Sequence, residues 1–594
     1  MRKPFGLGDN PCRPRHFLPV SGSGPVLDQT AQQSLETGRT RLLLTALIFV
    51  AGFAAIGARL VWVTLLRGGE ERVAHERQIE KFTPRRADIV DRNGVVVATM
   101  LTEPSLYADP RKIANPKEVA RKLVAVLPDL SEGEVLAKLS SDRGFVWLKR
   151  HLTPRQEYEV NRLGIPAFQF EHEERRVYPE GNLVAHIVGY SGMDDHGLAG
   201  IERGLDDMLR GSKEPLVLSI DLRLQHILYE ELSRAVADFT AKAGVGLILD
   251  LNNGEILSMI SLPDFDSNKP GSATSEMLFN RVTLGTYEMG STFKIFTTAM
   301  ALDAHTTSLT GGYDAAHAIH IGRFTITDYH AQNRWLSVPE IFEYSSNIGA
   351  ARMALDAGTE RQRDFLGRLG LLRAPTIEVP EIGAPQIPNP WHEVNTLTVA
   401  FGHGISVSPL QLAVAAGAVV DGGILRQATL LKRPDGYVPS GQQVMSQRTS
   451  EDMRRLMRLV VERGTGTNAA APGYVVGGKT GTAEKPSAHG YAHKALLSSF
   501  VGAFPINAPR YLVVAIIDEP QPNAKSHGFA TAGWTAAPVV GRTVQRIAPL
   551  LGVEVLDEKS PEIVRALEIN APSLSGSRVA AIGAKAAGNR HAAD

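Results

Sequence analysis

A long apolar run lies near the N-terminus of the chain. Over residues 42–58 the only polar side chain is Thr45, and the apolar character resumes after Arg59. At 1.5 Å of rise per residue, this run can cross about 30 Å of hydrocarbon, and a buried core helix rarely carries so much apolar surface. No small-residue cleavage site follows it. We therefore predict a retained transmembrane anchor over residues 42–66, preceded by a disordered tail over residues 1–41.

The pattern after the anchor alternates between helix and strand periods. Residues 89–97 predict a β-hairpin, because Asn93-Gly94 supplies the positive φ angles of a type I′ turn. Residues 116–139 and 153–164 have the apolar spacing of amphipathic helices. Residues 67–215 therefore form a mixed region in which no catalytic constellation stands out.

Strands and helices mix most densely over residues 216–552. Residues 245–251 and 255–260 predict one hairpin, and residues 499–504 and 511–517 predict two more strands joined by a short loop. No crossover helix separates the later segments, so they are expected to pair antiparallel.

The composition limits the classes of function. The 594 residues include 63 basic and 63 acidic side chains, so the net charge is zero and does not suggest a nucleic-acid partner. Cys12 is the only cysteine, which excludes a disulfide framework or a cysteine-based zinc site within one chain. From about residue 553 the chain becomes rich in Ala, Gly and Ser, and we expect a flexible tail over residues 553–594.

A serine and a lysine lie three residues apart in the segment Gly-Ser-Thr-Phe-Lys-Ile-Phe, residues 290–296. If this segment opens a helix, Ser291 and Lys294 share one face and come within hydrogen-bond reach. The following residues predict a buried helix, where a lysine head is unusual. Burial lowers the pKa of an amine, so a neutral Lys294 could take the proton from Ser291. A surface helix with an extended lysine is the alternative, and this pair alone does not exclude it.

Two further constellations lie downstream. Ser345-Ser346-Asn347 precedes a helical stretch, which its second or third residue could simply cap. Gly478-Lys479-Thr480-Gly481-Thr482 has a rival interpretation, because Gly473 together with Gly478-Lys479-Thr480 satisfies the phosphate-binding P-loop pattern. A P-loop needs a strand before its first glycine and a helix after its Lys-Thr pair. Neither is predicted here, which disfavours a nucleotide hydrolase.

Ser-x-x-Lys, Ser-x-Asn and Lys-Thr-Gly each occur once, in the chain order of penicillin-binding proteins and serine β-lactamases. From the anchor to about residue 550, the chain resembles the class B penicillin-binding proteins, specifically the division-specific septal peptidoglycan D,D-transpeptidases of the FtsI type. One departure is Ala87, which stands where the family usually has glycine, so its φ is expected to stay negative. The other matching segments are Tyr287-Glu288-Met289-Gly290, Gly464-Thr465-Gly466, Ala400-Phe401-Gly402-His403-Gly404 and Ser408-Pro409-Leu410-Gln411.

The resemblance implies an α+β protein in three structured parts. A single N-terminal transmembrane helix would occupy residues 42–66, and an elongated α/β pedestal domain of the dimerisation type would occupy residues 67–215. The transpeptidase domain, residues 216–552, would have a central antiparallel sheet flanked by helices, as serine β-lactamases do.

The resemblance also implies a role for each motif residue. Ser291 would attack the carbonyl between the two terminal D-alanines of a stem peptide, with Lys294 as general base. Ser345 would relay a proton to the leaving nitrogen. Asn347 would hold the substrate amide and help to position Lys294, and Lys479 would bring positive charge toward the substrate carboxylate. The remaining substrate contacts would come from Thr480, Gly481 and Thr482, with the backbone N–H groups of Ser291 and Thr482 forming the oxyanion hole.

The implied substrates are peptidoglycan stem peptides and lipid-linked glycan strands, and the implied inhibitors are β-lactam antibiotics. The implied partners are the polytopic septal glycan polymerase, other division proteins and the membrane, with no nucleic acid, cofactor or metal. The protein would be single-pass in the cell inner membrane, its N-terminus cytoplasmic and its catalytic domain periplasmic, although charges on both sides of the anchor do not fix this orientation. Two alternatives stay open: a D,D-carboxypeptidase or β-lactamase-type hydrolase, and a non-catalytic β-lactam-binding scaffold of the division machinery.

Overall fold

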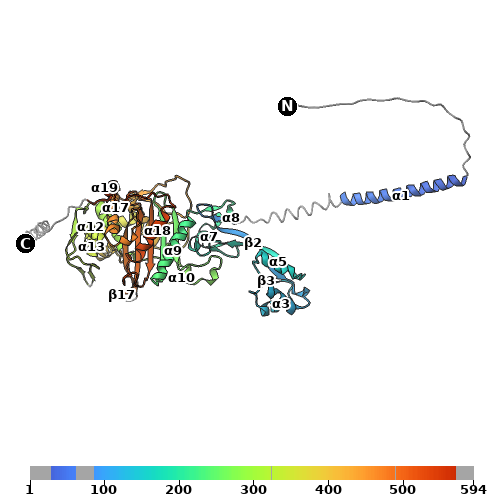
Figure 1. Ribbon diagram of the computed structural model, residues 1–594, viewed down its shortest axis with the longest axis horizontal. Coiled ribbons are helices and arrows are strands. Elements are labelled where there is room, and N and C mark those ends of the chain that lie inside the picture. Colours follow the sequence, from blue (N-terminus) through green and yellow to red (C-terminus); the bar gives the residue numbers. More distant parts are fainter. Residues whose placement is uncertain (1–28, 62–85, 323, 488–489, 570–594) are drawn as a thin grey trace, which may run out of the picture. The chain divides into compact units, whose positions relative to one another are not determined.

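The computed structural model describes residues 29–61, 86–322, 324–487 and 490–569 (Figure 1). The chain divides into two units, Met1–Thr83 and Pro84–Asp594, each of which is described by itself.

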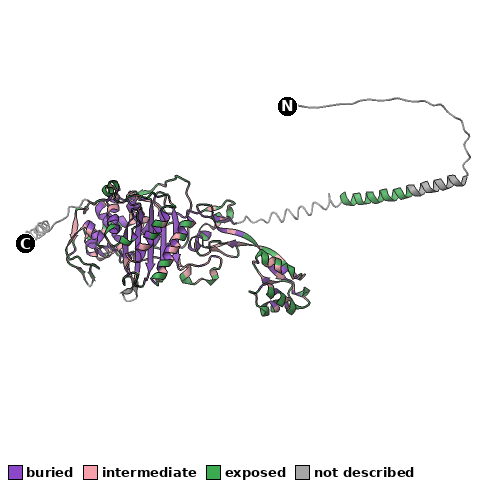
Figure 2. Cartoon of the chain, viewed as in Figure 1, coloured by how far each residue is buried: buried purple, intermediate pink, exposed green. Residues whose placement is uncertain are grey.

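In the first unit, helix α1 spans Gln29–Val61. Its segment Leu43–Val61 has a mean hydropathy of 2.1 and is 0% buried, so it is long and apolar enough to cross a membrane (Figure 2). The helix begins at Gln29, so residues 29–41 are helical rather than part of a disordered tail. Helix-favouring Gln, Leu, Glu and Arg in this stretch extend the helix. Residues 1–28 and 62–66 lie outside the described residues.

The second unit begins with a long β-ribbon. Strand β2 (Val96–Ala108) pairs antiparallel with β1 (Ile89–Val90) at its start and with β4 (Phe168–Val177) along most of its length. Strand β3 (Val146–Lys149) pairs with its far end. The small core at that end packs helices α3 (Pro116–Val126), α4 (Glu132–Leu139) and α5 (Pro154–Arg162) against the ribbon.

The turn between β1 and β2 differs from the predicted type I′ turn. Only Gly94 has a positive φ, 85°, and its N–H donates to the carbonyl of Asp91 at 3.0 Å. The Asp91 carboxylate accepts hydrogen bonds from the N–H groups of Asn93 and Val95, which stabilises this conformation. Ala87 is buried and its φ is not positive, as expected.

The base of the ribbon is fixed by buried charges. Glu202, in α7 (Gly200–Gly204), is fully buried and forms ion pairs with Arg86 at 2.5 Å and Arg176 at 2.7 Å. Because an unpaired buried charge is strongly destabilising, this triad holds the start of the chain's second unit against the end of β4.

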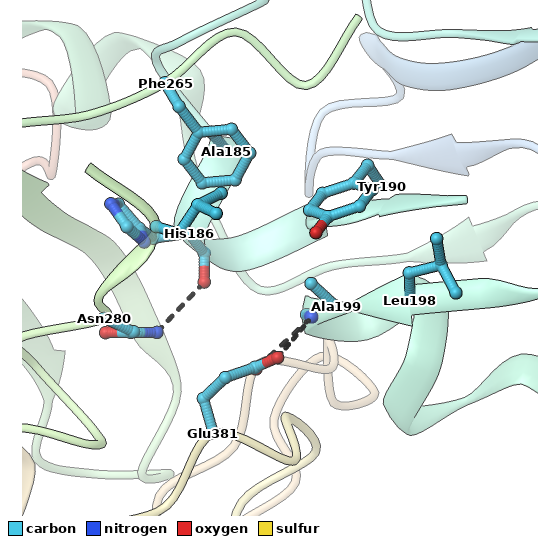
Figure 3. Close-up of a pocket in the computed structure, with 10 residues that line it drawn as sticks. Ala185, His186, Tyr190, Leu198, Ala199, Phe265, Asn280 and Glu381 are labelled. Carbon is cyan, nitrogen blue, oxygen red and sulfur yellow. Dashed lines mark hydrogen bonds between the residues drawn. The ribbon is translucent and has the colours of Figure 1, made fainter. Parts of the chain in front are cut away.

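A pocket of about 190 Å³ lies where residues 185–200 meet the larger part of the unit (Figure 3). The rings of Phe265 and Tyr190 contact each other edge to face on its wall. Across the pocket, the N–H of Gly200 donates to the Glu381 carboxylate at 3.2 Å. These contacts join the two parts of the unit at the pocket.

The larger part of the unit is built on a five-stranded antiparallel sheet. Its strand order is β16 (Gly477–Ser487), β17 (Gly490–Phe504), β18 (Tyr511–Asp518), β8 (Ala243–Asp250) and β9 (Ile256–Leu262). Alternate residues of β18 enter different cores: Val514 lies on one face and Val513 on the other. Helices α9 (Leu222–Asp238) and α18 (Ala536–Ile547) cover one face, and α11 (Lys294–Asp303), α16 (Pro409–Val420) and α17 (Gln447–Glu462) cover the other (Figure 1). The predicted α+β architecture is confirmed.

The C-terminal segment packs back onto this part. Helix α19 (Pro561–Leu567) buries Ile563 and Leu567. The Glu558 carboxylate accepts from Arg458 at 2.5 Å and from the N–H of Gly473 at 3.0 Å, and Arg458 also donates to the carbonyl of Val476, next to the start of β16. Residues 553–569 are therefore packed, where a flexible tail was expected, because their apolar side chains reach the core. Residues 570–594 lie outside the described residues.

Candidate active site

Ser291 and Lys294 meet at the start of a buried helix. Ser291 lies in the 3₁₀ turn Gly290–Phe293, which leads directly into α11 at Lys294. Side chains three residues apart eclipse each other in a 3₁₀ turn, and Lys294 Nζ lies 2.9 Å from Ser291 Oγ. The Lys294 side chain is buried, 1% exposed, which excludes the surface-helix alternative.

The Ser345-Ser346-Asn347 segment supplies three more oxygen atoms to the same amine. Ser346 caps helix α13 (Asn347–Ala357) by accepting from the N–H of Gly349. Lys294 Nζ lies 2.6 Å from the carbonyl oxygen of Ser345, 3.1 Å from its Oγ and 2.7 Å from Asn347 Oδ1. Ser345 has a φ of 58°, a strained conformation for a serine, which points its carbonyl and its hydroxyl at one amine.

Lys479 approaches the same turn from the edge strand β16. Its side chain is fully buried, its Nζ lies 3.0 Å from Ser345 Oγ, and it also lies over the ring of Phe342. Among the described residues, neither Lys294 nor Lys479 forms an ion pair. The hydroxyl of Ser345 thus lies between two buried amines.

Burial without a counter-ion lowers the pKa of both lysines. Burial lowers the pKa of Lys294 well below its usual range, and the nearby charge of Lys479 lowers it further. Burial lowers the pKa of Lys479 to about 7. Burial lowers the pKa of His403 to about 4, and the proximity of Lys294 contributes to this shift.

The arrangement of acceptors around Lys294 suits a neutral amine. A neutral amine donates two hydrogens and has one lone pair. The carbonyl oxygen of Ser345 and Asn347 Oδ1 can only accept, so they take the two hydrogens. The lone pair is left for the hydroxyl proton of Ser291, which is the geometry that a general base requires.

The turn that carries Ser291 packs closely against β16. A Cβ at Gly481 would lie 2.7 Å from the carbonyl oxygen of Met289, and a Cβ at Gly290 would lie 3.1 Å from the carbonyl oxygen of Thr482. Gly290 also has a φ of 56°, so glycine is required there both for space and for conformation. Ser291 and Thr482 therefore belong to two backbone segments in direct contact.

Two hydroxyls of the predicted substrate-binding residues are already engaged. Thr480 Oγ1 lies 2.6 Å from Thr465 Oγ1, and Thr482 Oγ1 accepts from the N–H of Ala532 at 3.2 Å. Thr465 is exposed, whereas Thr480 is buried. Thr465 belongs to none of the three motifs, although it lies in the matching segment Gly464-Thr465-Gly466.

The geometry excludes the P-loop interpretation. Lys479 lies inside β16, which pairs antiparallel with β17 from Gly477↔Ala503 onward. A strand, not a helix, follows the Lys-Thr pair, so no helix N-terminus is available there for phosphate.

Asp328, which belongs to none of the three motifs, contacts the residues after Ser345. Its carboxylate accepts from Ser346 Oγ at 2.6 Å and from the N–H of Ile348 at 2.9 Å. Asp328 lies in a loop with no recognisable pattern, and no sequence signal places it beside α13.

Comparison with known proteins identifies the family and the fold. The chain is 40% identical over 531 residues to the probable peptidoglycan D,D-transpeptidase FtsI of Caulobacter vibrioides, covering 87% of this chain and 89% of that protein. The chain belongs to the penicillin-binding protein family. The family's penicillin binding protein transpeptidase domain matches residues 244–540, and its penicillin-binding protein dimerisation domain matches residues 81–222. The resemblance predicted from three short motifs is confirmed.

Other members of the penicillin-binding protein family agree with this assignment. The peptidoglycan D,D-transpeptidase FtsI of Escherichia coli strain K12 is 27% identical over 552 residues, covering 86% of this chain and 91% of that protein. The crystal structure of penicillin-binding protein 3 from Mycobacterium tuberculosis, complexed with aztreonam, has a TM-score of 0.64 at 22% identity. It covers 80% of this chain and 97% of that chain, which shows the shared fold.

Proposed function

We propose that this penicillin-binding protein is a serine-type peptidoglycan D,D-transpeptidase that cross-links stem peptides during septal wall synthesis. The observation that carries the proposal is the buried amine of Lys294, which lies 2.9 Å from Ser291 Oγ and has no carboxylate partner among the described residues. The relatives named FtsI are called peptidoglycan D,D-transpeptidases, which supports the same reaction.

Acylation begins with proton transfer from Ser291 to Lys294. Ser291 Oγ attacks the carbonyl carbon between the two terminal D-alanines, and the backbone N–H groups of Ser291 and Thr482 stabilise the oxyanion. Loss of one such donor typically raises the barrier by about 2.7–4 kcal/mol. The C–N bond breaks as Ser345 donates its proton to the leaving nitrogen and takes up the proton held by Lys294, and D-alanine departs. Its position between the two amines suits Ser345 to this relay.

The cationic form of Lys479 attracts the substrate carboxylate, and the hydroxyls of Thr480 and Thr482 lie on the same strand to bind it. Gly481 lets the strand approach the turn of Ser291. Asn347 holds the substrate amide as well as Lys294. In the second half of the reaction, an amine of a neighbouring stem peptide attacks the acyl carbon. The ester C–O bond breaks, the proton lost by the amine passes through Lys294 to Ser291 Oγ, and the cross-linked product leaves.

We place the protein in the cell inner membrane, anchored by the apolar segment Leu43–Val61. The N-terminus is cytoplasmic and the catalytic part periplasmic, because the cross-linking reaction takes place in the cell wall. Lipid-linked glycan strands, the polytopic septal glycan polymerase and other division proteins are the proposed partners. β-Lactams are the proposed inhibitors, in keeping with the aztreonam complex of the mycobacterial relative.

Covalent labelling of the purified protein with a fluorescent penicillin tests the proposal. Wild type should be labelled and Ser291→Ala should not. Ser308→Ala should be labelled normally, because among the described residues the Ser308 hydroxyl bonds only Thr310 of its own loop. A label that persists supports a transpeptidase, whereas rapid loss of the label indicates a β-lactamase-type hydrolase. Absence of labelling in folded wild type contradicts a serine acyl-enzyme. Product analysis with and without an acceptor amine then separates cross-linking from carboxypeptidase activity.

A further inference from the structure

Two consecutive residues after β12 (Phe324–Ile326) contact the chain directly after Ser345, at Ser346, Asn347 and Ile348. The carbonyl oxygen of Thr327 accepts from Asn347 Nδ2 at 2.9 Å. The half-buried Asp328 carboxylate accepts from Ser346 Oγ at 2.6 Å and from the N–H of Ile348 at 2.9 Å.

The contact with Thr327 decides which way the Asn347 amide points. A carbonyl can only accept, so the Nδ2 end of the amide must face Thr327. Oδ1 then faces Lys294, where it accepts one of the two hydrogens of the neutral amine at 2.7 Å. If the amide reversed, two donors would meet and the lone pair of Lys294 would no longer be directed at Ser291.

Asp328 holds the same turn from the other side. Ser346 already caps α13 through the N–H of Gly349, so the bonds to Asp328 are additional to the cap. They restrain the residues on both sides of Asn347. These bonds also lie directly after Ser345 in the chain. The positive φ of Ser345 is strained, and it persists only where the surrounding structure holds it.

Asp328 is also a negative charge near the buried amine. The charged and titratable groups that act on Lys294 or on its neighbour His403 are Lys479 of β16, Asp328 and Glu484. Lys479 lowers the pKa of Lys294 and Asp328 raises it, so the two oppose each other.

We propose that Asp328 is a positioning residue for the catalytic base: with the carbonyl of Thr327 it fixes the Ser345-Ser346-Asn347 turn, and through that turn the direction of the Lys294 lone pair. The inference rests on the proposed function, since it assumes that Lys294 activates Ser291. It adds a residue outside the three motifs to the machinery of acylation.

The test compares full-length Asp328→Ala and Asp328→Asn with wild type. Asparagine keeps a carbonyl oxygen for the N–H of Ile348 and an amide group that can donate to Ser346 Oγ, but it lacks the charge. The control is Asp314→Ala, because the Asp314 carboxylate bonds only the N–H of Ala316 within the described residues. The rate constant of acylation by a fluorescent penicillin is measured between about pH 5 and pH 9, together with the melting temperature.

Asp328→Ala should be acylated about 10- to 100-fold more slowly than wild type at a similar melting temperature, because the base is misdirected. Asp328→Asn should recover most of the rate at pH 8. The acid side of its pH–rate profile, its acid limb, should move to lower pH, because the charge that raises the pKa of Lys294 is gone. Asp314→Ala should match wild type.

Wild-type acylation rates in Asp328→Ala would overturn the inference. So would an Asp328→Asn variant as slow as Asp328→Ala with its acid limb unmoved, since that is the result of a purely structural contact. If Asp328→Ala does not fold, the acid limb of Asp328→Asn decides alone. In each of these cases wild type is still labelled at Ser291, so the proposed function stands; only unlabelled wild type contradicts both.

Discussion

Lys294 and Lys479 converge on one atom, with their Nζ atoms 3.1 Å and 3.0 Å from Ser345 Oγ. Two buried ammonium groups this close repel each other, so the pair is expected to titrate as a coupled system. Burial lowers the pKa of Lys479 only to about 7, whereas burial and the charge of Lys479 together lower that of Lys294 well below its usual range, so Lys479 is the better candidate for the proton near neutral pH. Lys294 can then act as the base while Lys479 remains the cation.

The pH dependence of acylation should therefore be bell-shaped. Protonation of Lys294 removes the base on the acid side, and loss of the proton from Lys479 removes the cation that attracts the carboxylate above about pH 7. Lys479→Arg should displace the alkaline limb to higher pH, because a guanidinium keeps its proton. Rates of penicillin acylation across the pH range measure both limbs. An alkaline limb unmoved in Lys479→Arg would assign that limb to another group.

Lys294→Met should abolish acylation and raise stability by about 1 to 4 kcal/mol at neutral pH. The folded pKa of Lys294 lies below its unfolded value of 10.5, so between these values the unfolded chain binds the extra proton and wild-type stability increases with pH. The gain from methionine should therefore decrease as the pH rises from neutral toward 10.5. Chemical denaturation at several pH values measures it. A variant less stable than wild type at neutral pH would mean that the bonds of Lys294 outweigh its burial.

Gly402→Ala should slow acylation, because a Cβ at residue 402 would lie 2.2 Å from the carbonyl oxygen of Gly290 and displace the turn of Ser291. Gly370→Ala is the matched control: its φ of 76° is close to the 81° of Gly402, but a Cβ there meets nothing within 4 Å. Both should lose about 1 to 2 kcal/mol of stability to backbone strain. Only Gly402→Ala should also lose labelling rate, so equal labelling rates in the two variants would show that the contact is not needed.

The parts of the fold that follow from local spacing were predictable from the sequence. The three-residue spacing of Ser291 and Lys294 brings them together in any helical turn, and the apolar run in β18 (Tyr511–Asp518) is explained by burial on both faces. Asp328 was not predictable, because its contact with Ser346 depends on the path of a loop through space. The same is true of the strained φ of Ser345, which local sequence disfavours.

The chain ends also differed from expectation, for a related reason. Residues 29–41 were assigned to a disordered tail by the composition of the whole tail, yet their own residues favour helix and continue α1. Residues 553–569 look like a tail in composition, but Ile563 and Leu567 are spaced to bury on one side of α19. Composition averaged over a long segment hides such short patterns.

The packing of Glu558 against Arg458 and Gly473 has a genetic consequence. A nonsense or frameshift allele that removes everything after codon 552 would delete this brace, which lies next to the strand that carries Lys479. Such an allele should behave as a loss of function. An allele truncated just after codon 569 keeps the brace and should be tolerated much better. Truncation alleles recovered from viable cells should therefore have no stop codon before α19.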